Sequence, residues 1–369
     1  MGVEGLRMRG ILAAGFLASL PGWAHELGAS RYDYVRHVRP VFERHCAACH
    51  RPGGPAPMSL LRYEEAAPWA NAIKLMVLER RMPPWLPEEG LGVLRGTRGL
   101  PAPELDLLVE WASGGAPRGE GLDEGVGGAP KGSPESRADL VLPASRESVL
   151  GPEEVEKTEC VSFPARLERD RVLEAVELRP ENESIVRSAV FYHGDSCREE
   201  DRPLATWLPG DAAFEMPEGA GEMLRRGASL SARMLYRKTW ALDGQAVRER
   251  SRLALRFAKG RPAALTHLNL EPGTSAVLPR AVRVVSVFPR GARGASLHLQ
   301  ATRPGRDRER LFAVERYDPD WRAKYVLSVP LSLEAGTRVE AVSGGFWIDH
   351  LPGDPVTAGP RRGAPAGTP

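Results

Sequence analysis

Apolar residues recur at helical spacing in the first third of the chain. Ahead of the first cysteine, four of them share one helical face: Val35, Val38, Val41 and Phe42. Asp33 is a typical N-cap, so the pattern predicts a helix from Asp33 to the cysteine at position 46. Pro40 weakens this helix, because a proline in a helix interior removes one backbone hydrogen bond.

Two more helices are predicted before residue 118. Arginine, proline, glycine and alanine fill residues 51–57, which predicts a loop. A helix is expected to start near Pro68 and to run through Arg81. Its apolar face consists of Trp69, Ile73, Met76 and Val77. A third helix is expected to begin near Pro103 and to end at the two glycines that start with Gly114. Its apolar residues are Leu105, Leu108 and Trp111.

Beyond residue 137 the apolar period changes from helical to alternating. Apolar and polar side chains alternate at residues 230–236, 252–257 and 296–300, and turn residues separate such runs. This pattern is typical of antiparallel strands, and a region of about 215 residues is long enough for two β-sandwiches.

The chain is therefore predicted to be multidomain, with an all-α domain followed by an all-β region. Residues 115–137 are rich in glycine, proline, alanine and glutamate and almost lack large apolar residues, which indicates a linker. The predicted organisation is a signal peptide (1–24), an α-domain (30–118), a linker (119–137), two β-sandwiches (138–275 and 276–350) and a disordered tail (351–369).

The charge balance bears on nucleic-acid binding, and the N-terminal residues indicate the cellular compartment of the protein. The 50 basic residues nearly balance the 48 acidic ones, so no strong positive field points to nucleic acid. Arg7 and Arg9 precede an apolar run at residues 10–20, and small residues allow cleavage after Ala24. This run is too short to span a bilayer, and no later apolar run reaches eighteen residues. We expect a secreted or periplasmic protein with no membrane span in the mature chain.

Residues 46–50 read Cys-Ala-Ala-Cys-His, the attachment signature of a c-type haem. In this chemistry Cys46 and Cys49 form thioether bonds to the two haem vinyl groups, and His50 takes one axial site of the iron. The alternatives are half of a zinc site and a thioredoxin-like redox pair. No further ligands follow at zinc-site spacing, and no βαβ pattern surrounds the motif.

Two methionines are candidates for the second axial site of the iron, and a different ligand or none stays an open alternative. Met82 is favoured, because it follows the second predicted helix and precedes two prolines that keep the backbone extended. Met58 is the rival, and Met76 lies on an apolar helical face typical of core residues. A His/Met pair would raise the reduction potential relative to two histidines.

The remaining cysteines, Cys160 and Cys197, lie in the predicted β region. In an oxidising compartment they can form a disulfide. Two buried thiols are the alternative, and the sequence alone leaves both open.

The chain resembles the cytochrome c domain fused to bacterial copper type II, ascorbate-dependent monooxygenase-like proteins. The resemblance rests on residues 41–50, 57–60, 68–70, 82–85 and 111–117 in the first domain and, more weakly, on 178–182, 207–210, 317–321 and 333–338. It implies a class I-like cytochrome c domain with one covalent haem c. It also implies two jelly-roll-like sandwiches similar to those of peptidylglycine α-hydroxylating monooxygenase.

The copper ligands of that family do not carry over. The positions that correspond to its histidines hold Arg187, Ser188, Leu235, Arg290 and Ala292. A methionine ligand is expected near the C-terminus, yet the last methionine is Met234. These side chains offer no imidazole or thioether donor, so copper is not expected.

The histidines that remain after the haem motif are His193, His267, His298 and His350. No two of them are adjacent or two residues apart, and a solitary histidine is usually structural or solvated. His193 is the nearest to the missing pair and to Cys197, which makes it the only candidate for a displaced ligand.

The expected function is that of an exported mono-haem cytochrome that transfers single electrons to or from a redox partner protein. The β region would serve docking or structure, and the chain is not expected to be an enzyme. Two alternatives stay open: a copper-dependent monooxygenase with the haem as internal electron donor, and a redox-sensing binding protein.

Overall fold

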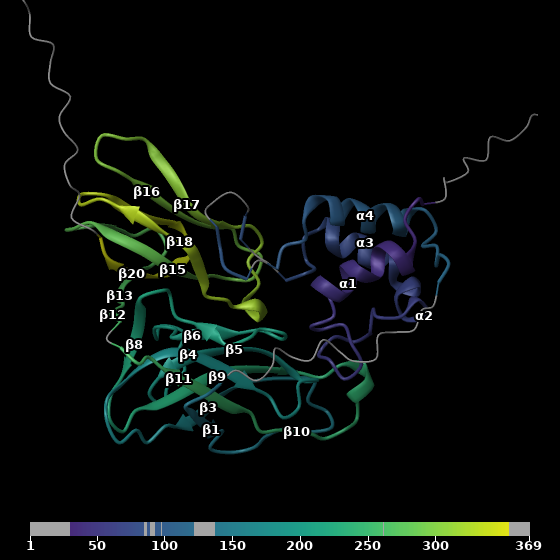
Figure 1. Cartoon of the computed structure of the whole chain (residues 1–369), viewed down its shortest axis with the longest axis horizontal. Coiled ribbons are helices and arrows are strands. Elements are labelled where there is room, and N and C mark those ends of the chain that lie inside the picture. Colours follow the sequence, from purple (N-terminus) through teal and green to yellow (C-terminus); the bar gives the residue numbers. More distant parts are fainter. Residues whose placement is uncertain are drawn as a thin grey trace, which may run out of the picture.

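A short N-terminal helical region precedes a large region of antiparallel β-sheets (Figure 1). The computed structural model describes residues 30–84, 87–88, 93–96, 98–121, 137–260 and 262–353. The predicted signal peptide, most of the linker and the tail beyond residue 353 lie outside these ranges. Within them, no helix is long and apolar enough to cross a membrane.

The first predicted helix is present but changes geometry at its proline. A π-helical turn, η1 (Tyr34–Val38), leads into α1 (Arg39–His45), and the Asp33 carboxylate accepts a hydrogen bond from the Arg36 amide as an N-cap. Pro40 therefore lies in the first turn of α1, where no amide donor is needed.

The second predicted helix differs at both ends. It begins earlier than Pro68, as α2 (Tyr63–Ala66) and η2 (Ala67–Trp69), and continues as α3 (Ala70–Leu78). It ends before Arg81, because Arg80 adopts a φ of 53° and the amides of Arg81 and Met82 both bond to the Met76 carbonyl.

The third predicted helix is confirmed as α4 (Ala102–Ser113), with Gly114 at its C-cap. It packs on η1 and α1 through large side chains that are fully buried: Tyr34, Phe42, Leu108 and Trp111. The rings of Phe42 and Trp111 meet edge to face at 6.2 Å. Residues 116–118, which follow this helix, also pack here, since the Trp111 indole donates to the Pro117 carbonyl.

The first β-unit, residues 137–264, has two main sheets. One has the order β1-β11-β4-β8-β12, with β7 beside β4, and contains β1 (Leu140–Pro143), β4 (Arg171–Arg179), β7 (Phe214–Glu215), β8 (Ala220–Leu224), β11 (Arg252–Phe257) and β12 (Ala263–Ala264). The other has the order β3-β9-β5-β6 and contains β3 (Glu156–Pro164), β5 (Val186–His193), β6 (Ala205–Trp207) and β9 (Ser229–Arg237). A short pair, β2 (Ser148–Leu150) with β10 (Val247–Glu249), and η3 (Trp240–Leu242) complete it.

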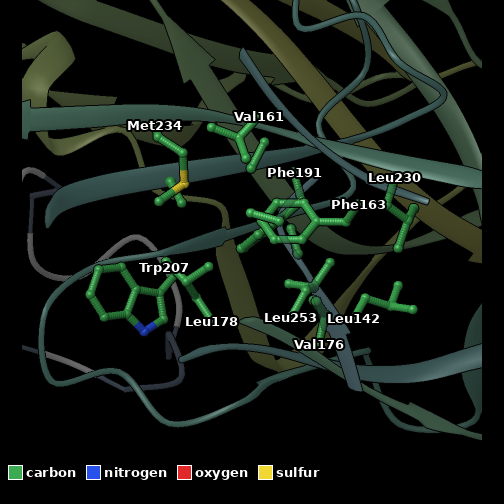
Figure 2. Packing of buried hydrophobic residues seen from close by; sticks show 14 of the residues in the cluster. Leu142, Val161, Phe163, Val176, Leu178, Phe191, Trp207, Leu230, Met234 and Leu253 are labelled. Carbon is green, nitrogen blue, oxygen red and sulfur yellow. The ribbon is translucent and has the colours of Figure 1, made fainter. Parts of the chain in front are cut away.

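Both main sheets contribute to one apolar core (Figure 2). The alternation predicted at residues 230–236 is confirmed, because Leu230 and Met234 of β9 are fully buried in this core. They share it with Phe163 and Phe191 from the same sheet and with Leu253 from the opposite sheet. Pairing in this unit is antiparallel except between β12 and β8.

The second β-unit, residues 266–353, repeats this layered plan. One sheet has the order β13-β20-β15-β18 and contains β13 (Thr266–Leu270), β15 (Val282–Arg290), β18 (Tyr325–Leu333) and β20 (Gly345–Pro352). The other has the order β14-β19-β16-β17 and contains β14 (Ser275–Val277), β16 (Leu297–Thr302), β17 (Arg308–Val314) and β19 (Arg338–Ser343), with η4 (Pro319–Trp321) after β17. A second apolar core lies between them.

Two boundaries differ from the sequence prediction. The second β-unit begins at Thr266 rather than at residue 276, because β13 pairs along β20 over its whole length. Residues 351–352 belong to β20 rather than to a disordered tail, since Leu351 is buried and pairs with Arg283 of β15.

The two remaining cysteines form a disulfide. Cys160 of β3 is bonded to Cys197, which follows β5. A bond of this kind persists in oxidising compartments, and it is therefore compatible with the predicted export.

Candidate functional site

The Cys-x-x-Cys-His motif forms a tight turn at the end of α1. The amides of Cys49 and His50 both bond to the Cys46 carbonyl, at 3.1 and 2.8 Å. This turn brings the two thiols and the imidazole together, and neither thiol is in a disulfide. The three predicted attachment residues thus lie on one turn, and Cys46 packs against the helical core.

The His50 ring is oriented by one backbone contact. Its Nδ1 lies 3.1 Å from the Met58 carbonyl oxygen. A carbonyl can only accept, so Nδ1 donates and Nε2 keeps a free lone pair. Burial lowers the pKa of His50 while the bond to Met58 opposes that change, and the net direction favours the neutral ring. A neutral imidazole held in this way is suited to binding a metal through Nε2.

The two thiols are not activated for redox exchange. Burial, together with the neighbouring Cys49, raises the pKa of Cys46 to about 12. Burial also raises the pKa of Cys49, although Arg98 and Arg187 pull it down. A thioredoxin-like pair requires a cysteine with a lowered pKa. The described residues also contain no cluster of three or more histidine, cysteine or acidic side chains that could hold a metal ion.

The two candidate methionines occupy different places. Met58 packs against the helical core next to the motif, and its own carbonyl holds His50. Met82 is half-buried just beyond α3, where its amide bonds to the Met76 carbonyl at 3.2 Å. The structure thus brings Met58 to the motif through its backbone and leaves Met82 on a separate segment.

The motif lies against the first β-unit. Arg51, directly after His50, pairs with Glu183. Arg98 donates to the Pro209 carbonyl at 3.1 Å and also pairs with Asp211. Between these contacts the backbone of Gly210 lies so close to Ala48 that a Cβ at position 210 would come within 2.3 Å of the Ala48 Cβ.

Replacing Gly210 by alanine is expected to loosen this docking. Alanine is strained at this position, because φ is +82°, and its Cβ would also clash with Ala48. Gly227→Ala is a matched control, since Gly227 has a φ of +71° and open space around it. We expect Gly210→Ala to lower the free energy of unfolding by about 1–2 kcal/mol more than the control, measured by denaturant unfolding. Equal losses would contradict the close contact.

Arg187, Ser188 and Leu235, the positions of the first β-unit at which the resemblance would place copper ligands, are neighbours and offer no imidazole or thioether. Ser188 of β5 pairs directly with Leu235 of β9. Arg187 lies at a register shift in β5, is buried, and bonds to the Ser184 carbonyl at 3.1 Å. Burial, with a smaller effect of Arg237, lowers the pKa of Arg187 to about 10, so the guanidinium stays charged at neutral pH.

The corresponding positions at the end of β15 are also occupied by non-ligands. Arg290 donates to Asn269 at 2.6 Å and to Glu271 at 2.9 Å. Its guanidinium lies over the Trp347 ring, 5.8 Å from the centroid. Arg290 therefore has a structural role in the second β-unit, and Ala292 lies in the turn that follows.

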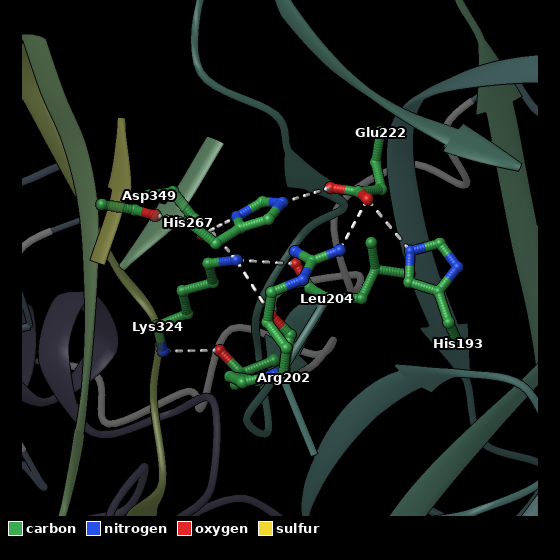
Figure 3. Close-up of polar contacts among 10 residues, drawn as sticks. His193, Arg202, Leu204, Glu222, His267, Lys324 and Asp349 are labelled. Atoms are coloured by element: carbon green, nitrogen blue, oxygen red, sulfur yellow. Dashed lines mark hydrogen bonds and ion pairs between the residues drawn. The ribbon is translucent and has the colours of Figure 1, made fainter. Parts of the chain in front are cut away.

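Three of the four remaining histidines pair with carboxylates. His193 contacts Glu222 at 3.1 Å, and His267 contacts Asp349 at 2.8 Å. Arg202 also donates to Glu222, so a guanidinium lies beside that carboxylate as well. Figure 3 shows these groups in one network between the two β-units. His298 contacts Glu315 at 3.0 Å, and His350 is buried.

Sequence reasoning missed the centre of this network. Lys324 and Asp349, both buried, form an ion pair at 2.5 Å. The Lys324 ammonium also donates to the carbonyls of Pro203 and Leu204 in the first β-unit (Figure 3). A lysine and an aspartate 25 positions from one another give no local pattern, so no signal in the sequence could have found them.

Comparison with known proteins adds little. No family model matches the chain, and no curated protein matches it. Among solved structures, a turret protein of Sulfolobus turreted icosahedral virus is similar over 57% of this chain and 97% of its own, with 11% identity and a TM-score of 0.16. An oxalate decarboxylase from Bacillus subtilis is similar over 53% of this chain and 69% of its own, with 7% identity and a TM-score of 0.15. TM-scores this low support no conclusion about fold or function.

Proposed function

We propose that this chain is an exported c-type cytochrome that transfers single electrons. The observation that carries the proposal is the turn at residues 46–50, where two thiols stand beside an imidazole whose Nδ1 is already bonded to a backbone carbonyl. Thiols outside a disulfide and a histidine with free Nε2 are the groups that covalent haem attachment requires. Cys46 and Cys49 would hold the porphyrin, and His50 would bind its iron.

A bound haem would supply a one-electron iron couple. The residues of this chain would orient it: the Met58 carbonyl fixes the His50 ring, and the apolar helical core beside Cys46 would help to exclude water from the site. The disulfide between Cys160 and Cys197 supports export to an oxidising compartment, where such haems are attached.

We assign the second axial site to Met82 rather than to Met58. The Met58 carbonyl contacts Nδ1, the nitrogen on the edge of the imidazole that points away from any metal at Nε2. The Met58 backbone already serves to orient the His50 ring, and we infer that its side chain would not also supply the second ligand. Met82 comes from a different segment and is free of this restriction.

The β region supports a docking or structural role in this proposal. We propose that it consists of two jelly-roll-like sandwiches behind a class I-like cytochrome c domain, with the copper chemistry of the resembling family lost. Support comes from the two layered cores and from the side chains of Arg187, Ser188 and Leu235, which offer copper no suitable donor.

The test is the spectrum of full-length protein produced with the cytochrome c maturation machinery. A pyridine haemochrome signal of the c type that stays with the denatured chain is expected, with one iron and no copper per chain. Protein without covalent haem would refute the proposal, and stoichiometric copper beside iron would favour a copper-dependent monooxygenase instead.

Methionine variants test the second axial ligand. In Met82→Ala the weak long-wavelength band of methionine–iron(III) ligation should disappear and the reduction potential should fall, because a thioether ligand favours the reduced iron. Met58→Ala serves as the control and should keep the band. Loss of the band in Met58→Ala alone would assign the ligand to Met58.

A further inference from the structure

The chain between α3 and α4 is attached to the second β-unit. Pro87 forms a bridge with Val314, and Leu94 forms one with Leu327. We call the described residues of this stretch, Pro87, Glu88 and 93–96, the bridging segment. Its backbone bonds include the Glu88 amide to the Ala313 carbonyl at 3.0 Å and the Arg95 amide to the Val326 carbonyl at 2.8 Å.

These contacts join two different sheets. β17, which ends at Val314, is an edge strand of one sheet, and β18, which contains Leu327, is an edge strand of the other. The Leu94 side chain packs on the apolar core between them. Backbone bonds at two sheet edges together with apolar packing hold the bridging segment in one position.

The bridging segment follows Met82 in the chain. The residues that precede Met82 are attached to the same part of the second β-unit. The Arg316 guanidinium donates to the carbonyl of Glu79, the residue that caps α3. Glu88 of the bridging segment pairs with Arg310 at 2.9 Å. Met82 therefore lies on a short piece of chain whose two ends, at Glu79 and at Pro87, are both attached to residues 310–316.

We infer that the second β-unit is a positioning device for Met82. This inference rests on the proposed function, because it assigns a role towards the iron. Fixing both ends of a short chain removes conformations in which the thioether points elsewhere, so less entropy is lost when it binds. Arg316 and Leu94 are positioning residues in this arrangement, since neither touches the iron.

The test uses full-length, haem-loaded ferric protein titrated with imidazole, which replaces a methionine ligand. Arg316→Ala is expected to bind imidazole about fivefold more tightly, the equilibrium equivalent of losing one hydrogen bond that holds the methionine segment. Arg316→Lys retains a donor and should restore part of the difference. Met82→Ala defines the upper limit, because its methionine is absent.

Arg303→Ala is the matched control. Arg303 is an arginine of the same β-unit that also donates to a backbone carbonyl, that of Ser332, and pairs with Glu309. It makes no contact with the bridging segment among the contacts of the described residues, so this variant should bind imidazole like the wild type. Leu94→Ala is a second, independent variant and should shift in the same direction as Arg316→Ala.

A second measurement, which does not depend on a ligand exchanging at the iron, completes the test. Amide hydrogen exchange in a peptide that covers residues 76–84 should become faster in Arg316→Ala and stay unchanged in Arg303→Ala. If both Arg316→Ala and Leu94→Ala match the control in imidazole affinity and in exchange, the inference is wrong, and an intact haemochrome signal would leave the proposed function standing. A missing haemochrome signal in the wild type would instead remove the proposed function itself.

Discussion

Replacing Cys46 and Cys49 together by alanine is expected to abolish covalent haem. The two thiols lie on one turn, both outside a disulfide, and the other two cysteines are already bonded to each other. No other free thiol in the described residues can form a thioether. After extraction with acidified organic solvent, the haem should leave the variant chain and remain on the wild-type chain, as measured by the pyridine haemochrome spectrum.

The control is the double variant Cys160→Ala with Cys197→Ala. It removes the same number of sulfur atoms from the β region, so covalent haem should persist although stability falls by about 2–4 kcal/mol. Haem that stays covalently bound to the Cys46/Cys49 variant would contradict the attachment. Haem lost from both variants would point to a general failure of maturation.

Breaking the buried ion pair of the second β-unit, whose lysine also bonds to the first β-unit, is expected to have the largest effect on stability. Lys324→Met leaves the Asp349 carboxylate buried without its ammonium partner, and the Pro203 and Leu204 carbonyls lose their donor. Removing one member of a buried pair costs about 3–5 kcal/mol. Denaturant unfolding followed by tryptophan fluorescence measures the loss. Arg248→Met, which removes an exposed pair with Glu147, should change stability by less than about 0.5 kcal/mol.

The stabilisation that ionised Asp349 contributes depends on pH in a predictable direction. Burial raises the pKa of Asp349, but Lys324 and the hydrogen bonds from His267 and Ser286 more than offset this, and the net pKa lies below its usual value. Such a carboxylate adds stability above the unfolded pKa of about 3.9 and loses that contribution as the pH falls towards the folded pKa. The difference between wild type and Lys324→Met should therefore narrow below about pH 4. A constant difference down to pH 2 would contradict the ionised pair.

Local sequence patterns predict which helices and strands are present better than they predict where each one begins and ends. The spacing of Leu108 and Trp111 and the glycine that follows predicted α4, because a helix face and its cap are encoded within a dozen residues. The end of α3 was missed, because it depends on a positive φ at Arg80, a residue that does not usually mark helix ends. The strand at 266–270 was assigned to the wrong β-unit, because its partner in β20 lies far along the chain.

In the candidate site, too, the sequence predicts some features, and others are visible only in the structure. Cys46, Cys49 and His50 lie in one five-residue motif, so the spacing alone predicts covalent haem attachment there. The Met58 carbonyl that orients His50 and the contact between Ala48 and Gly210 are tertiary features, since each depends on how a loop folds back. No periodicity or motif encodes such contacts, so only the structure could supply them.

The bridging segment has a consequence for the order of folding. Glu88 and Arg310 are paired across 222 positions of the chain, so the helical region cannot complete its contacts until almost the whole polypeptide is available. Contacts between distant positions form slowly, because a long loop must close first. If the chain is exported as proposed, it emerges from its N-terminal side, and the cysteines at 46 and 49 would be accessible well before β17 and β18 form. The proposed haem attachment at the motif and the immobilisation of the segment that carries Met82 would then be two separate events, and the second would require that the C-terminal sheets have folded.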